Sequence, residues 1–193
     1  SSNFSVSWGD GTITDYVEAT TEISHTYSDT NFEGWVYIYG DWLGISFGEY
    51  GYTNEKKIVI KIIYDNNITA LPTSALREVK NLSHLTLPES LTTMNDYCIF
   101  NSDALKEIII PNSVTTIGHQ AIDNLNGLIK VKFPLGITKT TKVANSSIYK
   151  IDIPDTVTEI IHASFQYCKN LDNVDIPKNV NSIGINAFYG CSS

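Results

Sequence analysis

The sequence predicts a mainly β protein in which a small β-sandwich-like domain precedes a solenoid of about six 23-residue repeats. The period is the strongest observation, because prolines recur at spacings of 23, 23, 20 and 23 residues, at Pro88, Pro111, Pro134, Pro154 and Pro177. Such a fixed period is typical of solenoids, in which each repeat buries its apolar face only against its neighbours. Short alternating apolar runs before these prolines and a change of composition near residue 55 support the same fold class.

The acidic front of the chain, residues 1–57, is the predicted sandwich-like domain. Residues 1–55 contain nine acids, no lysine or arginine and all three tryptophans, whereas residues 56–193 contain twelve acids and thirteen bases. Residues 4–8 and 35–39 have the pattern of half-buried strands. Asp10-Gly11 predicts a tight turn, since both central positions of a type I′ turn need positive φ. We therefore place the domain boundary between residues 57 and 58.

The rest of the chain, residues 58–193, divides into six units. They begin at Val59, Leu82, Leu105, Leu128, Ile148 and Leu171. The first unit is degenerate, with Asp65 where the proline belongs, as expected for the end of a repeat array. The fourth unit is three residues short, and the loss falls between Thr140 and Ile148. We expect a bulge or a loosened turn there.

Each unit should supply one short strand and a second extended segment. The alternation at residues 108–110 predicts the strand, and the proline that follows should end the pairing because it has no N–H to donate. A second apolar pair, such as Val114 and Ile117, suits the opposite wall of the solenoid. A small residue followed by a large one, as in Ser164-Phe165 and Ala187-Phe188, should then fill the interior.

Three of these units read IIIPNSVTTIGHQAI, IDIPDTVTEIIHASFQYCKNL and VDIPKNVNSIGINAFYGC, and they resemble the BspA-like leucine-rich repeat of bacterial cell-surface proteins. The resemblance covers residues 59–193, with departures at Asp65, at Ile161 in place of glycine, and in the short fourth unit. It implies a leucine-rich-repeat solenoid in a secreted or surface-anchored protein of host-associated bacteria. Such proteins act in adhesion or protein binding, and no cofactor is expected.

The front of the chain carries a second resemblance. The residues VSWGDGT at 6–12, HTY at 25–27 and GWVYI at 34–38 resemble the PKD-type immunoglobulin-like domain. Immunoglobulin-like sandwiches usually have about 100 residues, so the resemblance implies a truncated or reduced domain. PKD-type domains commonly act as spacers between a cell wall and a binding or catalytic module.

Charge and hydropathy exclude several classes of function. The net charge of −8 disfavours nucleic-acid binding, which needs a basic surface. No run of 18 apolar residues occurs, so no membrane span is predicted. The chain does not open with a charged and then apolar leader, and we expect the leader of a surface protein to be absent from it.

Catalysis is not predicted. Cys168 and Cys191 occupy the same position of consecutive units, where parallel stacked side chains seldom converge as a disulfide requires, so they should act as small apolar plugs. Ser83 and His84 are adjacent, but neighbouring strand residues point to opposite faces, and we expect no contact between them.

No metal site is predicted either. Three front-domain acids could supply oxygen ligands to calcium, namely Asp10, Asp15 and Glu18. No loop motif supports that hypothesis, and the alternative is that Asp10 caps its own turn.

The exposed face of the strands is the candidate binding surface. The candidate site residues are Ile109, Ile129, Lys130, Lys132, Tyr149 and Lys150. Three of them are apolar and three are lysines, and an apolar centre with a charged rim is typical of protein interfaces. The alternative is an ordinary solvated face with incidental aliphatic side chains.

The sequence thus predicts a non-catalytic extracellular module that binds a host or matrix protein through the solenoid face. An acidic or sulfated glycan is the second class of partner, because the three lysines should form one positive patch. The alternative functions are a structural spacer, or an accessory module of a larger secreted protein such as a glycan-degrading enzyme.

Overall fold

The fold is mainly β in the part of the chain that the structure describes. The computed structural model describes residues 4–7, 11–16, 37–40, 61–63, 68–80 and 82–192, which contain strands and turns but no helix. These residues therefore include no helix that could cross a membrane. The strands are β1 (Phe4–Ser7), β2 (Ile13–Tyr16), β3 (Tyr37–Gly40), β4 (Lys61–Ile63), β5 (Ala70–Leu71), β6 (His84–Thr86), β7 (Thr93–Met94), β8 (Glu107–Ile109), β9 (Thr116–Ile117), β10 (Lys130–Lys132), β11 (Lys150–Ile151), β12 (Glu159–Ile160), β13 (Asn173–Val174) and β14 (Ser182–Ile183).

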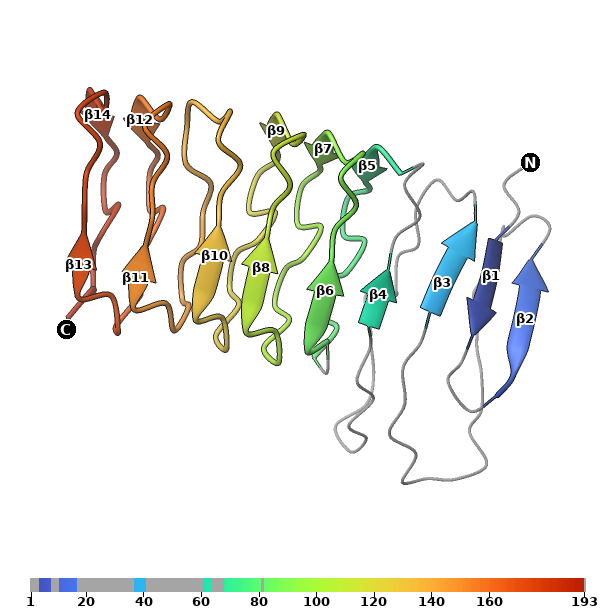
Figure 1. Cartoon of the computed structure of the whole chain (residues 1–193). Helices are drawn as coiled ribbons and strands as arrows, with labels where there is room; N and C mark the ends of the chain where they lie inside the picture. The colour runs from blue at the N-terminus through green and yellow to red at the C-terminus, as the bar shows by residue number, and fades with distance from the viewer. Residues whose placement is uncertain are drawn as a thin grey trace.

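Strands β4, β6, β8, β10, β11 and β13 line up along one side of the molecule, which we call the first wall (Figure 1). Within its paired segments the strands are parallel, and partner residues are 23 positions apart: Lys61 pairs with His84, and Lys150 pairs with Asn173. Each turn of the chain therefore sets its strand beside the strand of the preceding turn, as the sequence period predicts.

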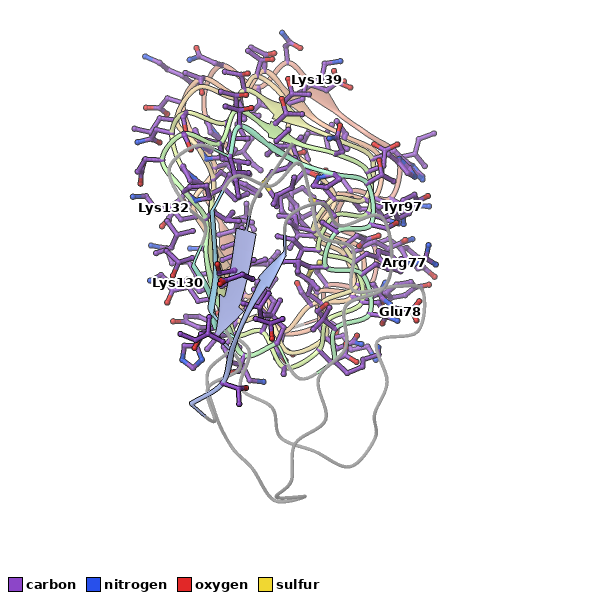
Figure 2. The ribbon with its side chains drawn as sticks, turned by 90° about the vertical axis from the view of Figure 1, so that its right-hand side faces the viewer. Arg77, Glu78, Tyr97, Lys130, Lys132 and Lys139 are labelled. Atoms are coloured by element: carbon purple, nitrogen blue, oxygen red, sulfur yellow. The ribbon has the colours of Figure 1, made fainter. Side chains whose placement is uncertain are left out.

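Two further sides complete each turn. Strands β5, β7 and β9 form one parallel sheet, β12 and β14 form another, and together they make the second wall. The third side of each repeat contains tight turns of the backbone instead of strands, and we call it the turn wall. Figure 2 separates the three sides: Lys130 and Lys132 lie on the first wall, Lys139 on the second wall and Tyr97 on the turn wall.

Apolar side chains from all three walls meet inside the stack. One column of apolar side chains runs through successive turns, and Ile99, Ile122, Val143 and Phe165 are fully buried in it. Phe188 continues this column in the last turn, where it is partly buried, and its ring stacks on Phe165 with centroids 5.3 Å apart. The interior role predicted for the phenylalanines is confirmed.

Threonine hydroxyls join successive turns at the edge of the second wall. Thr92 Oγ1 donates to the carbonyl of Thr69 at 3.0 Å, and Thr158 Oγ1 donates to the carbonyl of Thr138 at 3.2 Å. The same two carbonyls also accept backbone N–H groups, from Thr92 and Thr158, so the hydroxyls add a second hydrogen bond between neighbouring turns.

The turn wall contains pairs of residues with left-handed backbone. Tyr97 and Asn101 have φ of 55° and 59°, and Ala163 and Tyr167 have φ of 54° and 58°. This conformation costs a residue with a Cβ about 1–2 kcal/mol. It is held by hydrogen bonds between turns, such as the one from Tyr167 N to the carbonyl of Tyr189 at 2.7 Å.

The fourth turn is irregular. Val143 comes four residues after Lys139. In the fifth turn, Phe165 comes six residues after Glu159, which pairs with Lys139. On both walls a single isolated bridge, instead of a strand pair, joins the fourth turn to the fifth. The irregularity predicted for the short fourth unit is confirmed.

The short turn also accommodates Ile161 at a position that is glycine in the third and sixth turns. A Cβ on the matching Gly184 would lie 2.4 Å from the backbone nitrogen of His162 in the preceding turn, which is closer than real Cβ contacts. The backbone that crowds Gly184 belongs to Ile161 and His162. The short fourth turn, which precedes Ile161, lacks the residues equivalent to these two. The N–H of Ile161 donates instead to Thr140 Oγ1 at 3.0 Å.

The described front residues form one antiparallel sheet with strand order β2-β1-β3. Strand β3 lies beside β4, so this sheet continues the first wall beyond the repeats (Figure 1). Val6 of β1 is buried in the same hydrophobic cluster as the repeats. The front sheet therefore covers the first turn of the stack and shares its core.

Several predictions for the front fall outside the described residues. These are the boundary between residues 57 and 58, the tripeptide at 25–27, the Trp8–Asp10 segment and any second sheet of a sandwich. Gly11 is described, and its φ of 91° agrees with the predicted tight turn.

Candidate binding surface on the first wall

The six candidate residues all lie on the first wall. Lys130 and Lys132 are the exposed ends of β10, with Val131 buried between them, so the alternation of the strand turns both lysines outward. Ile109 ends β8, Lys150 begins β11, and Ile129 and Tyr149 immediately precede β10 and β11.

Five of the six line one hollow of about 320 Å³ in which the fourth and fifth turns meet. Its candidate residues are Ile129, Lys130, Lys132, Tyr149 and Lys150. Ile109 is not part of the lining, but it pairs with Lys132 in the neighbouring strand. Leu135 also lines the hollow; the strand pattern does not predict it, because Leu135 follows Pro134, beyond the predicted strand.

The apolar members of this surface are open to water. Their exposed fractions are 51% for Ile109, 43% for Ile129, 61% for Leu135 and 60% for Tyr149. We call these four side chains the apolar strip. Covering them would be favourable by about 25 cal/mol for each Å² of apolar area removed from water.

Carboxylates neutralise two of the three lysines. Lys130 Nζ donates to Glu107 Oε1 at 2.5 Å, and this hydrogen bond and the charge of Glu107 raise the pKa of Lys130. Lys150 Nζ lies 3.2 Å from Asp152 Oδ1. Among the described residues, Lys132 has no carboxylate partner, so the positive patch is smaller than the sequence analysis predicts.

A second hollow, of about 240 Å³, adjoins the first on the side of the last turn. It is lined by Tyr149, Lys150, Ile151, Asp172, Asn173 and Asp175. In the part of the chain that is described, neither Asp172 nor Asp175 forms an ion pair. Tyr149 therefore lies between a hollow with three lysines and one aspartate and a hollow with one lysine and two aspartates.

The cysteines are unsuited to nucleophilic chemistry. All three are free, and burial raises the pKa of Cys98 to about 12 and that of Cys168 to about 11. Thiols with such pKa values remain protonated at neutral pH, whereas the thiolate is the reactive form.

One expectation about side-chain contact is wrong. Ser83 Oγ and His84 Nδ1 lie 2.9 Å apart on the surface. The alternation rule fails here because Ser83 precedes β6 and is not part of the strand. An exposed contact between serine and imidazole does not by itself activate the hydroxyl, which also needs an oriented imidazole and donors for an oxyanion.

The calcium hypothesis gains no support. Asp10 and Glu18 lie outside the described residues, and Asp15 Oδ1 accepts a hydrogen bond from Ser5 Oγ at 2.5 Å. The described residues contain no group of three or more histidines, cysteines or acids that could hold a metal ion.

Solved structures with the same fold are bacterial leucine-rich repeat proteins. One from T. pallidum is 18% identical with a TM-score of 0.64, and the match covers 81% of this chain and 81% of that one. One from Bacteroides ovatus is 18% identical with a TM-score of 0.53, covering 88% of this chain and 55% of that one. One from Eubacterium ventriosum is 23% identical with a TM-score of 0.52, covering 65% and 41%. The chain thus spans about half the length of the last two.

These likenesses show a common fold. No curated protein matches the sequence. The profile of the BspA type leucine rich repeat region matches residues 45–144 and 142–193, with six copies of the repeat. Since this match covers most of the sequence, and the strands recur at the same period, the chain belongs to the BspA-type leucine-rich-repeat family.

Proposed function

We propose that residues 58–193 form a leucine-rich-repeat solenoid that acts as a non-catalytic binding module of a secreted or surface-attached bacterial protein. A PKD-like domain in residues 1–57 precedes it. The first wall recognises a host or matrix protein through the apolar strip. Leucine-rich repeats typically bind proteins, and membership of the family supports this class of function.

The apolar strip is the observation that carries the proposal. Ile129, Leu135 and Tyr149 come from two adjacent turns and line one hollow, although packing of the stack requires none of them. An exposed apolar patch that is rimmed by charged residues is typical of a protein interaction site. Tyrosine is among the residue types that contribute most to interface energy.

A binding screen tests the proposal. The 193-residue chain is immobilised and exposed to a panel of purified matrix proteins and sulfated glycans. Tyr149→Ala should weaken binding of any protein hit by about 10- to 100-fold, as loss of an interface hot spot does. Tyr189→Ala is the matched control, because Tyr189 is 57% exposed but lies on the turn wall.

Equal affinity of wild type and Tyr149→Ala for every hit would refute the assignment of the first wall. Greater sensitivity to Tyr189→Ala would place the binding surface on the turn wall instead.

A structural spacer is the alternative function. The front sheet continues the first wall and shares the core of the repeats, and such a continuous rod suits a spacer. A screen in which no protein or glycan binds the folded chain favours the spacer.

A further inference from the structure

The charges on the first wall are segregated along the stack. The third and fourth turns present three lysines and one acid: Lys106, Lys130, Lys132 and Glu107. The fifth and sixth turns present one lysine and three acids: Lys150, Asp152, Asp172 and Asp175. The wall is therefore positive in its third and fourth turns and negative in its last two turns.

Ion pairs within the wall sharpen this division. Lys130 is paired with Glu107, and Lys150 is paired with Asp152. The charges left without an ion pair, within the described residues, are Lys106 and Lys132 at one end and Asp172 and Asp175 at the other.

The apolar strip lies between the two charged ends. Tyr149 lines both hollows, and Asp172 and Asp175 line the smaller hollow with it. A tyrosine ring beside carboxylates can hold a cation, because the face of the ring and the carboxylates both attract positive charge.

We infer that the first wall binds a protein segment of mixed charge that runs along the stack. This inference rests on the proposed function and adds the chemistry and direction of the partner. Acidic side chains of the segment lie against Lys106 and Lys132, apolar side chains cover the apolar strip, and an arginine or lysine enters the smaller hollow beside Tyr149.

The spacing of the turns sets the length of the segment. Neighbouring strands lie about 4.8 Å apart, so the third and sixth turns are separated by about 14 Å, which an extended chain covers in about four residues. A sulfated glycan carries negative charge along its whole length, and at the last turn it would meet Asp172 and Asp175. Like charges facing each other across an interface select against a partner.

A random 12-residue peptide library displayed on phage is the probe. It is selected on the immobilised 193-residue chain, and the recovered peptides are synthesised for affinity measurement. We expect peptides in which an acid and a base lie about four positions apart, with mainly apolar residues between them. Tyr149→Ala should weaken them at least tenfold, and Lys132→Glu and Asp175→Lys should each weaken them about fivefold. Tyr189→Ala should leave the affinity unchanged.

The outcomes separate the inference from the proposed function. One outcome is that the peptides lose affinity with Tyr149→Ala but bind Asp175→Lys as well as or better than wild type. This would overturn the inference of a mixed-charge partner and would leave the proposed binding function of the first wall intact. Binding of heparin at physiological salt that disappears with Tyr149→Ala would likewise overturn the mixed-charge partner and leave the proposed binding function intact. Selected peptides that bind Tyr149→Ala with full affinity would overturn both. Unchanged melting temperatures of the variants, all at exposed positions, show that each variant is folded.

Discussion

Replacing Phe165 by alanine should cost more stability than any single change on the surface of the stack. Phe165 is fully buried, and its ring stacks on Phe188 at a centroid distance of 5.3 Å. Core phenylalanines cost about 3–5 kcal/mol when they are cut to alanine, and full burial puts the expected loss near 4 kcal/mol. Phe188 is only partly buried in the last turn, so Phe188→Ala should cost about 2 kcal/mol.

The stacked pair should also make the two losses non-additive. Each single change removes the same ring contact, which is worth about 0.5–1.5 kcal/mol. The double variant should therefore lose less than the sum of the singles by about 1 kcal/mol. A control in the same turn is Ile185→Ala, which should have almost no effect because Ile185 is 77% exposed.

Urea denaturation followed by circular dichroism measures all four variants, and the slope of the transition shows whether unfolding stays cooperative. Equal losses for Phe165→Ala and Phe188→Ala would refute the reasoning, since they would mean that the interior and terminal turns bury their plugs equally. A loss from Ile185→Ala as large as that from Phe188→Ala would refute the assignment of inward and outward positions.

Four further predictions concern backbone crowding, buried thiols and the exposed wall. Gly184→Ala should lower the free energy of unfolding by about 1–3 kcal/mol; Gly136→Ala, where a Cβ meets nothing within 4 Å, should leave it almost unchanged in the same melts. Iodoacetamide at neutral pH should alkylate Cys191 before Cys98, because burial raises the pKa of Cys98 to about 12, and mass spectrometry gives the order. Because the pKa of Cys98 is raised in the folded state, the unfolded chain loses this proton at a lower pH than the folded protein does. The free energy of unfolding should therefore fall as pH rises above the ordinary thiol pKa of 9.0, and it should fall less steeply in Cys98→Ala. A free energy of unfolding that stays constant from about pH 8 to 11 would contradict this. Tyr149→Ala should shift the melting temperature by less than about 2 °C, as surface changes do, and a large drop would show a structural role for the ring.

The stack could be predicted from the sequence because equivalent positions of every unit hold the same type of residue and have the same place in the fold. A leucine or isoleucine at a fixed offset must be buried in each turn, so the period reveals both the winding and the inward face. The outward positions of Lys130 and Tyr149 follow from the same register. The short fourth unit could also be located, since a loss of three residues interrupts a period that is otherwise regular.

Other features depend on contacts that a one-dimensional pattern does not contain. Lys130 and Glu107 occupy the same position of adjacent units, yet whether two such side chains form an ion pair depends on their rotamers. Leu135 lies after the proline that ends the strand, and only the path of the turn returns it to the hollow. The contact of Ser83 with His84 depends on where β6 begins, which alternation locates poorly.

The isoleucine that replaces a glycine after the short turn limits how freely these repeats can be exchanged. In a modular array, any repeat could be duplicated, deleted or moved without regard to its neighbour. Here Ile161 follows a repeat that lacks the residues that crowd Gly184, and Thr140 Oγ1 accepts the N–H that in the sixth turn donates to the carbonyl of Ile160. The contact between Ile161 and Thr140 therefore belongs to the fourth and fifth repeats as a pair. A designer who builds longer arrays from this chain should copy them together, or restore glycine at position 161 when the fifth repeat follows one of full length.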